Sequence, residues 1–313
     1  MFGRLFGKSG AAKKGSGINP LSSGIRDAIL ATVGSSSIPT MPAAAQKAFQ
    51  LSTDPRADAR DFVEVIEADE SLSARVLKIA NSVYFDRGKP SSTIEESVTV
   101  IGINELRCLL NATTLSEIFP SRHVFRAQAW SNDIATAIIA RNLARRLLPS
   151  KDEVAFLGGL MHDIGKLLLL QRSGDDYGRV IKLVEERGIP FCEAETEVYV
   201  FNHAEAGQLI GQKWNFSDEL NLIIRTHHDN FEDQSSRMSL PCLIKAADTI
   251  AHALGLGHMR GFTRFRNRAI EELPRLWELL GIPASEQKDL LSSCERAYNH
   301  EYDLYVSKTV RQD

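Results

Sequence analysis

The stretch from Phe156 to Leu170 constrains the fold of this chain more than any other part of the sequence. It is the most apolar run in the chain, and its apolar residues follow the i, i+3, i+4, i+7 spacing that is typical of a helix. The run also contains three glycines, each of which costs about 1 kcal/mol in a helix relative to alanine. Three glycines in one buried helix predict that another backbone, or a ligand, approaches this helix closely.

The same run contains the adjacent pair His162 and Asp163. Burying an imidazole or a carboxylate without a partner is expensive, because each group loses its hydrogen bonds to water. We therefore expect both side chains to be hydrogen-bonded, ion-paired or bound to a metal ion.

The bulk properties of the chain exclude some classes of function. With 313 residues the chain can bury a substantial core and form two subdomains. A formal net charge of -3 gives no overall attraction to nucleic acid, so we expect no nucleic-acid partner. The cysteines are widely spaced and form no CxxC motif, which is typical of reduced thiols in a cytoplasmic protein; they are Cys108, Cys192, Cys242 and Cys294.

The sequence does not predict a membrane protein. No apolar run reaches the roughly 18 residues that a membrane-spanning helix needs. Residues 1–20 are rich in glycine, serine and lysine and are expected to form a disordered tail without the apolar core of a signal peptide. Phe2, Leu5 and Phe6 in this tail allow weak contact with an anionic membrane, but the segment is too short for stable anchoring.

Helical patterns follow one another along the rest of the chain, with proline and glycine stops between them and no notable strand-like alternation. The fold is therefore predicted to be all-α. The expected helices cover about 21–33, 42–53, 58–67, 71–84, 94–100, 103–118, 126–148, 153–172, 176–187, 193–213, 217–229 and 239–254, with two more within 270–309. Residues 255–268 are expected to form a basic, glycine-containing connection.

Further polar residues lie on later helices of this series. They are His203, the pair His227 and His228, and Asp248, which stands in an otherwise apolar helix. Imidazole and carboxylate groups from separate helices of a bundle commonly build a site for one or two metal ions. Such a site can lower the pKa of bound water and hold a phosphodiester for in-line attack.

These residues also carry a family resemblance. The pieces HDIGK, HAEAG, HH and AADTIA resemble the HD superfamily of metal-dependent phosphohydrolases and its HD-GYP branch. Further pieces resemble the HDOD domain more narrowly: SIPTMPAA, EADESLSARVLKIANSVYF, the helix around Ile101 to Arg107, and WNFSDELNLIIRTHH. The resemblance covers roughly residues 36–255. It implies a multi-helix HDOD fold with a helical N-terminal subdomain at 21–125, an HD-like helical core at 126–255 and a C-terminal helical extension at 256–313.

The chain departs from the superfamily pattern at two places. An HD hydrolase is expected to have a histidine on the helix before the HD pair, and Asn132 stands there, 30 residues before His162. An amide is a much poorer ligand for a transition metal than an imidazole, and Asp133 is expected to be turned about 100° away on the helix. No Gly-Tyr-Pro loop follows His228, so the hydrolysis of cyclic di-guanylate does not carry over.

Each candidate also has a purely structural interpretation. His162 and Asp163 can form a hydrogen-bonded pair that fixes helix packing, and His203 can be an ordinary histidine. His227 and His228 would be favourable as cations at the end of a helix. Lys166 lies one turn after the HD pair, where it can contact a phosphate or form a solvated helix end. Four arginines form either a solvated face or a site for an anionic partner: Arg260, Arg264, Arg266 and Arg268.

Three hypotheses follow for the function. The first is a non-catalytic, cytoplasmic signalling module of bacterial type that binds signalling proteins, in a pathway that uses a nucleotide second messenger. The second is a metal-dependent phosphohydrolase in which Lys166 stabilises charge and iron, manganese or zinc is bound. Its expected metal ligands are His162, Asp163, His203, His227, His228 and Asp248. The third is a nucleotide-binding sensor without turnover.

Overall fold

The described part of the chain is helical. The computed structural model describes residues 20–34, 38–41, 46–47, 49–51, 54, 56–85, 87–231, 238–257 and 262–306. These residues contain α-helices and one short 3-10 helix but no β-strand, which confirms the prediction of an all-α fold. The predicted tail, apart from residue 20, and much of the predicted helix at 42–53 lie outside the described residues.

The helices follow the chain in three groups. The first group is α1 (Ser23–Val33), α3 (Ala59–Glu67), α4 (Glu70–Ala80), η1 (Val83–Phe85), α5 (Ile94–Ile101) and α6 (Ile103–Ile118). The second is α7 (Phe125–Leu147), α8 (Asp152–Met161), α9 (Ile164–Arg172), α10 (Gly174–Arg187), α11 (Phe191–Tyr199), α12 (His203–Lys213), α13 (Asp218–Thr226) and α14 (Leu240–Leu254). The third is α15 (Thr263–Leu279) and α16 (Ala284–Tyr305).

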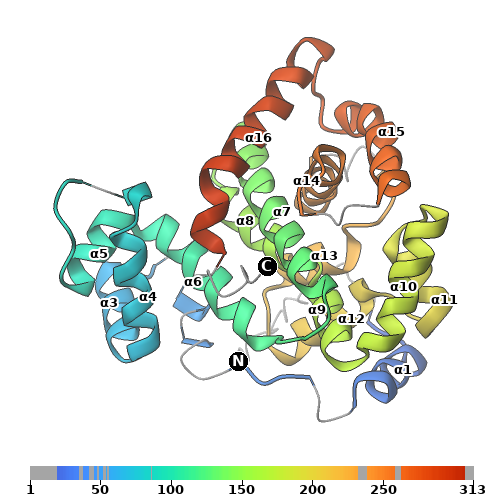
Figure 1. Cartoon of the computed structure of the whole chain (residues 1–313), viewed down its shortest axis with the longest axis horizontal. Coiled ribbons are helices and arrows are strands. Elements are labelled where there is room, and N and C mark those ends of the chain that lie inside the picture. The colour runs from blue at the N-terminus through green and yellow to red at the C-terminus, as the bar shows by residue number, and fades with distance from the viewer. Residues whose placement is uncertain are drawn as a thin grey trace, which may run out of the picture.

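Helices α3, α4 and α5 form a separate lobe, and α6 leads from this lobe to the centre of the molecule (Figure 1). Helix α1 lies on the other side of the molecule, where it packs against α9, α11 and α12 (Figure 1). Its Arg26 donates a hydrogen bond to Gln212 of α12 at 2.9 Å. The division of the chain near residue 125 stays a prediction.

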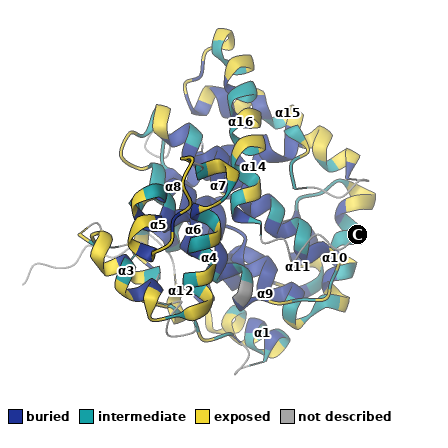
Figure 2. Cartoon of the chain, turned by 60° about the vertical axis from the view of Figure 1, so that its left-hand side comes forward, coloured by how far each residue is buried: buried dark blue, intermediate teal, exposed yellow. Residues whose placement is uncertain are grey.

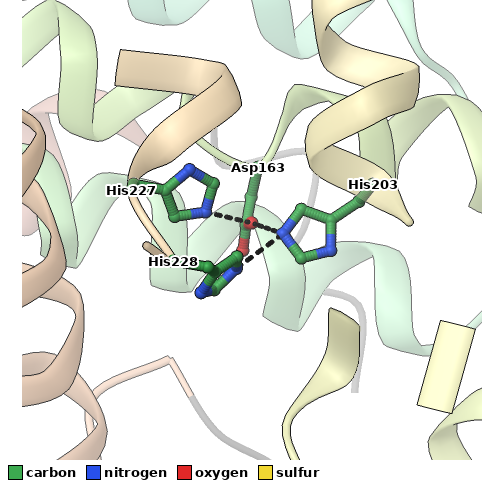
Figure 3. Close-up of side chains that lie close together, drawn as sticks. All are labelled: Asp163, His203, His227 and His228. Carbon is green, nitrogen blue, oxygen red and sulfur yellow. Dashed lines mark hydrogen bonds and ion pairs between the residues drawn. The ribbon is translucent and has the colours of Figure 1, made fainter. Parts of the chain in front are cut away.

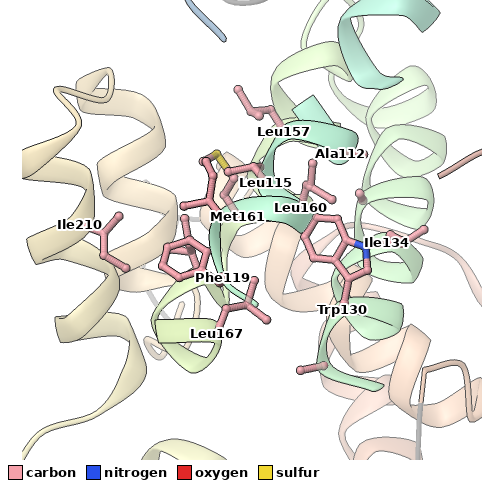
Figure 4. Close-up of a cluster of buried hydrophobic side chains, with 14 of the residues drawn as sticks. Ala112, Leu115, Phe119, Trp130, Ile134, Leu157, Leu160, Met161, Leu167 and Ile210 are labelled. Carbon is pink, nitrogen blue, oxygen red and sulfur yellow. The ribbon is translucent and has the colours of Figure 1, made fainter. Parts of the chain in front are cut away.

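The core is centred on α7, α8 and α9, where buried residues dominate (Figure 2). Every residue from Ile164 to Leu170 is buried, as expected for a helix that is apolar on all sides. Figure 4 shows where α6, α7, α8, α9 and α12 meet around Phe119, Trp130 and Met161. A Cβ atom on Gly159 would lie 2.6 Å from Cα of Ala137 on α7. The predicted close approach at the glycines of this run is therefore confirmed.

Three predicted boundaries are wrong. The predicted helix at 153–172 is two helices, because the chain turns at His162 and Asp163 between α8 and α9. The predicted helix at 193–213 is also two, since Val200 adopts a left-handed conformation with φ of 63° after α11. Helix α15 begins at Thr263, inside the segment that was expected to be a connection. In the part of the chain that the structure describes, no helix is both long and apolar enough to span a membrane.

Candidate metal centre

Four side chains from three helix ends converge at the centre of the second helical group. Asp163 precedes α9, His203 is the first residue of α12, and His227 and His228 follow α13. One ligand atom from each lies within 4.8 Å of the ligand atoms of the other three (Figure 3). Residues up to 65 positions apart in the chain thus share one point, where the sequence predicted a metal site.

The turn between α8 and α9 and the glycine that follows it bring these residues together. Asp163 precedes α9 with φ of -102° and ψ of 17°, and its carboxylate lies between the imidazoles of His203 and His227 (Figure 3). A Cβ atom on Gly165 would overlap the backbone carbonyl of His203, so only glycine allows α9 and α12 to approach this closely. The close approach places Asp163 Oδ1 3.0 Å from His203 Nε2.

Glu195 of α11 fixes the orientation of His203. Its Oε2 accepts hydrogen bonds from Nδ1 of His203 at 2.6 Å and from the backbone N–H of His203 at 2.8 Å. Its Oε1 accepts a hydrogen bond from the hydroxyl of Tyr177 at 2.7 Å, and all three side chains are fully buried. With Nδ1 bound to Glu195, the other ring nitrogen, Nε2, faces Asp163 and His228. Burial alone would lower the pKa of His203, but Glu195 and Asp163 raise it, so a metal ion bound at Nε2 would take the place of a proton. A carboxylate behind a histidine is the usual partner of a metal-binding imidazole.

His227 is oriented in the same way by backbone carbonyl groups. Its Nδ1 donates to the carbonyl oxygens of Ile223 and Ile224 at 3.2 and 3.0 Å. Its Nε2 therefore carries a lone pair, and this atom lies 3.7 Å from Asp163 Oδ1. Neither His227 Nε2 nor Asp163 Oδ1 has a hydrogen-bond partner among the described residues, although both atoms are buried. Imidazole nitrogens and a carboxylate oxygen converge here, which is the donor set that a divalent transition metal prefers.

A second group lies on the other side of Asp163. Nδ1 of His162 donates to the carbonyl of Gly159 at 2.7 Å, so its Nε2 faces two carboxylates. This Nε2 is 3.3 Å from Asp163 Oδ2 and 3.6 Å from Asp248 Oδ1. The ammonium group of Lys166 is ion-paired with Asp163 Oδ2 as well. Asp248, which was expected to be a metal ligand, therefore has a partner in His162.

The structure around Asn132 differs from the expectation for its neighbour Asp133. Asn132 is buried, and its Nδ2 has no hydrogen-bond partner among the described residues. Asp133, which we expected to be turned away, contacts the cluster, since its Oδ1 lies 3.9 Å from Nδ1 of His162. Burial raises the pKa of Asp133 well above its usual value. A protonated carboxyl group at position 133 binds a metal ion more weakly than an imidazole does. The superfamily pattern has an imidazole at the preceding position, where this chain has Asn132.

The electrostatic environment divides the cluster into charged and neutral members. Burial alone would lower the pKa of His162, but Asp163, Asp248 and Asp133 raise it to about 9. Burial lowers the pKa of His227 to about 4, so this imidazole is neutral at pH 7, as a metal ligand must be. Burial opposes ionisation of Asp163, but His162 and Lys166 hold its pKa well below the usual value.

The sequence-based prediction did not include Glu195 and His252 in the site, and it did not anticipate the burial of Lys166. Glu195 lies on the apolar face of α11 beside Phe191 and Ala194, and a carboxylate at such a position was the available signal. His252 belongs to none of the sequence motifs, but its Nε2 lies 3.1 Å from Asp248 Oδ1, one turn away on α14. The interpretation of Lys166 as a solvated helix end is wrong, because the residue is only 5% exposed.

An all-α fold with a buried His/Asp cluster at the ends of its central helices defines a class of HD-like helical proteins. The family model for the HDOD domain matches residues 38–230, and the chain therefore belongs to the HDOD domain family. An uncharacterized protein of Treponema pallidum (strain Nichols) is 26% identical over 196 residues, which make up 61% of this chain and 38% of that protein.

Solved structures have the same fold. An HDOD domain protein of unknown function from Geobacter sulfurreducens has a TM-score of 0.65 at 20% identity, covering 87% of this chain and 96% of that one. A chain named as a candidate phosphohydrolase from Shewanella amazonensis SB2B has a TM-score of 0.68 at 24% identity, covering 89% and 97%. A chain named as a candidate signal transduction protein from Marinobacter aquaeolei VT8 has a TM-score of 0.68 at 20% identity, covering 90% and 64%.

Proposed function

We propose that this chain is a non-catalytic signalling module that acts through contacts with other signalling proteins and holds one divalent transition metal ion. The ligands of this ion are Asp163, His203, His227 and His228. The observation that carries the proposal is the convergence of Nε2 of His203 and Nε2 of His227 on Asp163 Oδ1, which has no hydrogen-bond partner among the described residues. Nε2 of His203 also lies 2.8 Å from Nε2 of His228. Three imidazole nitrogens and a carboxylate oxygen this close together in a buried site require either a proton on His203 Nε2 or a metal cation between them, and we propose the cation.

A module without turnover is favoured by the second group of side chains. The ammonium group of Lys166 binds Asp163 Oδ2, on the side where a second metal ion would have to share this carboxylate. Asn132 supplies no imidazole there. A second cation would therefore be repelled by Lys166 and would lack a strong ligand, so the clamp of two metal ions that stabilises phosphodiester cleavage is incomplete.

The lengths of the related proteins support the proposal that this chain acts through contacts with other proteins. The matched region is 38% of the Treponema pallidum protein and 64% of the Marinobacter aquaeolei chain, so related domains occur beside further segments. We propose that the partners of this chain are signalling proteins in a cytoplasmic pathway that uses a nucleotide second messenger. The location and the pathway stay predictions from the sequence.

Metal content tests the proposal directly. We expect near-stoichiometric iron, manganese or zinc in protein purified without chelator, and loss of the metal in Asp163→Ala. The control is Asp289→Ala, because Asp289 is exposed on α16 and should leave metal content unchanged. Equal metal content in Asp163→Ala and the wild type would contradict this ligand set, and a folded wild-type protein that takes up no added metal would contradict the site altogether.

The second candidate is a metal-dependent phosphohydrolase. It is favoured by a cavity of about 200 Å³ that reaches the metal ligands His227 and His228 and is also lined by Lys166 and Asp248. A bound metal ion would supply Lewis acidity and an activated water molecule in such a site. Hydrolysis of a phosphodiester by the metal-loaded wild type and by Asp289→Ala, but not by Asp163→Ala, would establish this function in place of the first. Nucleotide binding without hydrolysis would identify the sensor instead.

A further inference from the structure

The cavity beside the candidate metal centre has a wall that the HDOD match does not include. The family match ends at residue 230, whereas α14 and α15 follow it and supply more than half of the residues that line the cavity. Phe265 of α15 packs edge-to-face against Phe191 at 5.6 Å and against His252 at 4.8 Å between ring centroids. Helix α15 is held in this place by extensive packing on α14 and by contacts with α10. The C-terminal extension is therefore part of the site.

Three cationic side chains from three helices line the cavity. Lys166 of α9 is fixed by its ion pair with Asp163 and lies 4.5 Å from the ring centroid of Phe191. Lys245 of α14 donates to the carbonyl oxygen of Asp229 at 3.2 Å and lies 3.7 Å from Glu272 Oε1. These contacts hold both ammonium groups at the cavity before any ligand enters.

Arg268 of α15 is the third cation, and it belongs to the basic segment that the sequence singled out. Arg264 donates to the carbonyl oxygen of Glu186, and Arg266 donates to that of Ala253 at 3.0 Å. Both therefore hold α15 to neighbouring elements. Among the described residues Arg268 has no ion-pair partner, and it is exposed at the rim of the cavity. Its planar guanidinium group is suited to two parallel hydrogen bonds with one phosphate.

The size of the cavity limits what can enter. Its volume of about 200 Å³ lies below the range of about 300–1,000 Å³ that is usual for pockets that bind drug-sized ligands. One terminal phosphate group fits this volume. Each phosphate of a cyclic dinucleotide is joined to two sugars of the ring, so it cannot enter the cavity without them, and the ring is too large for this volume. Phe265 of α15 packs against Phe191 in the cavity lining, so α15 bounds the cavity.

We infer that Arg268, Lys245 and Lys166 form a binding site for a single phosphate group, and that α15 excludes cyclic dinucleotides from it. The ligand is either inorganic phosphate or the phosphate of a small monoester whose remaining part stays outside the cavity. This inference rests on the proposed function, because it names the ligand of the same site. The three cations bind phosphate whether or not a metal ion is present, so the two proposals can fail separately.

Isothermal titration calorimetry of the full chain tests the inference. Inorganic phosphate, adenosine monophosphate and cyclic di-guanylate are titrated into the metal-loaded protein and into the protein after removal of metal by chelator. We expect phosphate or the monophosphate to bind both preparations and cyclic di-guanylate to bind neither. Tighter binding of the monophosphate than of phosphate would identify a monoester as the ligand, and the reverse would identify inorganic phosphate.

The decisive variant is Arg268→Ala, which should weaken phosphate binding at least tenfold and leave metal content unchanged. Arg268 is exposed, so the variant should fold, and Arg296→Ala on the exposed face of α16 is the matched control with unchanged affinity. Equal phosphate affinity in Arg268→Ala and the wild type would overturn the inference. Binding of cyclic di-guanylate as tight as that of phosphate would overturn it too, and so would absence of phosphate binding in both preparations. None of these outcomes bears on metal content, which decides the proposed function.

Discussion

Glu195 is the residue on which the orientation of the candidate metal centre depends. It is completely buried, and it accepts hydrogen bonds from two atoms of His203 and from Tyr177. A buried carboxylate in this position holds one tautomer of the imidazole and increases the basicity of its other nitrogen atom. The carboxylate of Glu195 would therefore act on a metal ion held by His203 without contacting that ion.

Replacing this carboxylate tests its role. Glu195→Gln keeps the shape of the side chain but removes its charge, and we expect metal affinity to fall by about 10- to 100-fold because the imidazole becomes less basic and less well oriented. Affinity is measured by competition with a chelator, and circular dichroism checks the fold. The control is Glu197→Gln on the exposed side of the same helix, where Glu197 pairs with Arg187 at 2.7 Å. An unchanged affinity in Glu195→Gln would show that Glu195 is only a packing residue.

Gly165 is the second residue whose identity is dictated by the site. Its missing side chain lets the carbonyl group of His203 approach the backbone of α9. In Gly165→Ala the added methyl group would overlap this carbonyl, so we expect a loss of roughly 2–4 kcal/mol of stability, as for other overpacked cores. Thermal or urea unfolding measures the change.

Gly24→Ala is the matched control for this substitution. Gly24 lies in the first turn of α1, where nothing lies within 4 Å of an added Cβ atom. Alanine is the better helix former there, so we expect this variant to gain about 0.5–1 kcal/mol. If Gly165→Ala were as stable as the wild type, the close approach of α9 and α12 would not be needed for folding.

At the scale of the elements, α16 is bound to α6 and α7 by a buried hydrogen-bond network. Tyr305 at the end of α16 is 1% exposed, and its hydroxyl donates to Glu105 of α6. Arg141 of α7 donates to Glu105 at 3.0 Å, to the hydroxyl of Tyr305 at 3.1 Å and to Glu301 of α16. The network connects α6, α7 and α16, which come from all three helical groups.

Removing the hydroxyl group of Tyr305 tests how much this network contributes to the free energy of unfolding. In Tyr305→Phe the ring still packs 5.1 Å from Phe156, but Glu105 and Arg141 each lose a hydrogen-bond partner. We expect a loss of about 1–3 kcal/mol in the free energy of unfolding, because these partners are largely buried. Tyr84→Phe serves as control, since Tyr84 is 37% exposed and makes no hydrogen bond to Glu105 or Arg141 in the described part of the chain. Equal stability of Tyr305→Phe and the wild type would mean that α16 is held by apolar packing alone.

The positions where one helix ends and the next begins are also set by contacts between elements and by capping residues. The pattern of apolar residues continues through α8 and α9, yet the chain turns at His162 and Asp163 so that both side chains reach the cluster. Between α11 and α12, Asn202 and Glu205 form a capping box, with hydrogen bonds of 3.1 and 3.0 Å. The capping pattern was a sequence signal for the start of α12, and the apolar periodicity obscured it.

At the scale of the whole molecule, the distribution of burial determines which thiols can react. The four cysteines are free, and Cys108, Cys242 and Cys294 are buried. Burial raises the pKa of Cys108 and of Cys294 to about 12, so almost no thiolate is present at pH 8. Cys192 is partly exposed and lines the cavity beside the candidate metal centre.

We therefore expect a thiol reagent at pH 8 to modify Cys192 first in the native protein and all four thiols after denaturation. The readout is absorbance of the released thiolate, with the modified residue mapped by mass spectrometry. Cys192→Ser should leave no rapidly reacting thiol. Rapid modification of Cys108 or Cys294 in the folded wild type would contradict the packing of the core.

The sequence alone determined the helical class and the candidate ligands, because both depend on local information. Apolar spacing predicted the helices, and the glycines near His162 predicted a close approach that Gly159 and Gly165 make. The tertiary structure decided the rest. The apolar periodicity of α8 and α9 does not indicate the break between them. The pairing of Glu195 with His203 is a contact between two helices, which local sequence patterns do not show. The contact of Asp133 with His162 and the position of Arg268 beside the cavity likewise depend on how helices cross, which is set by the packing of the whole core.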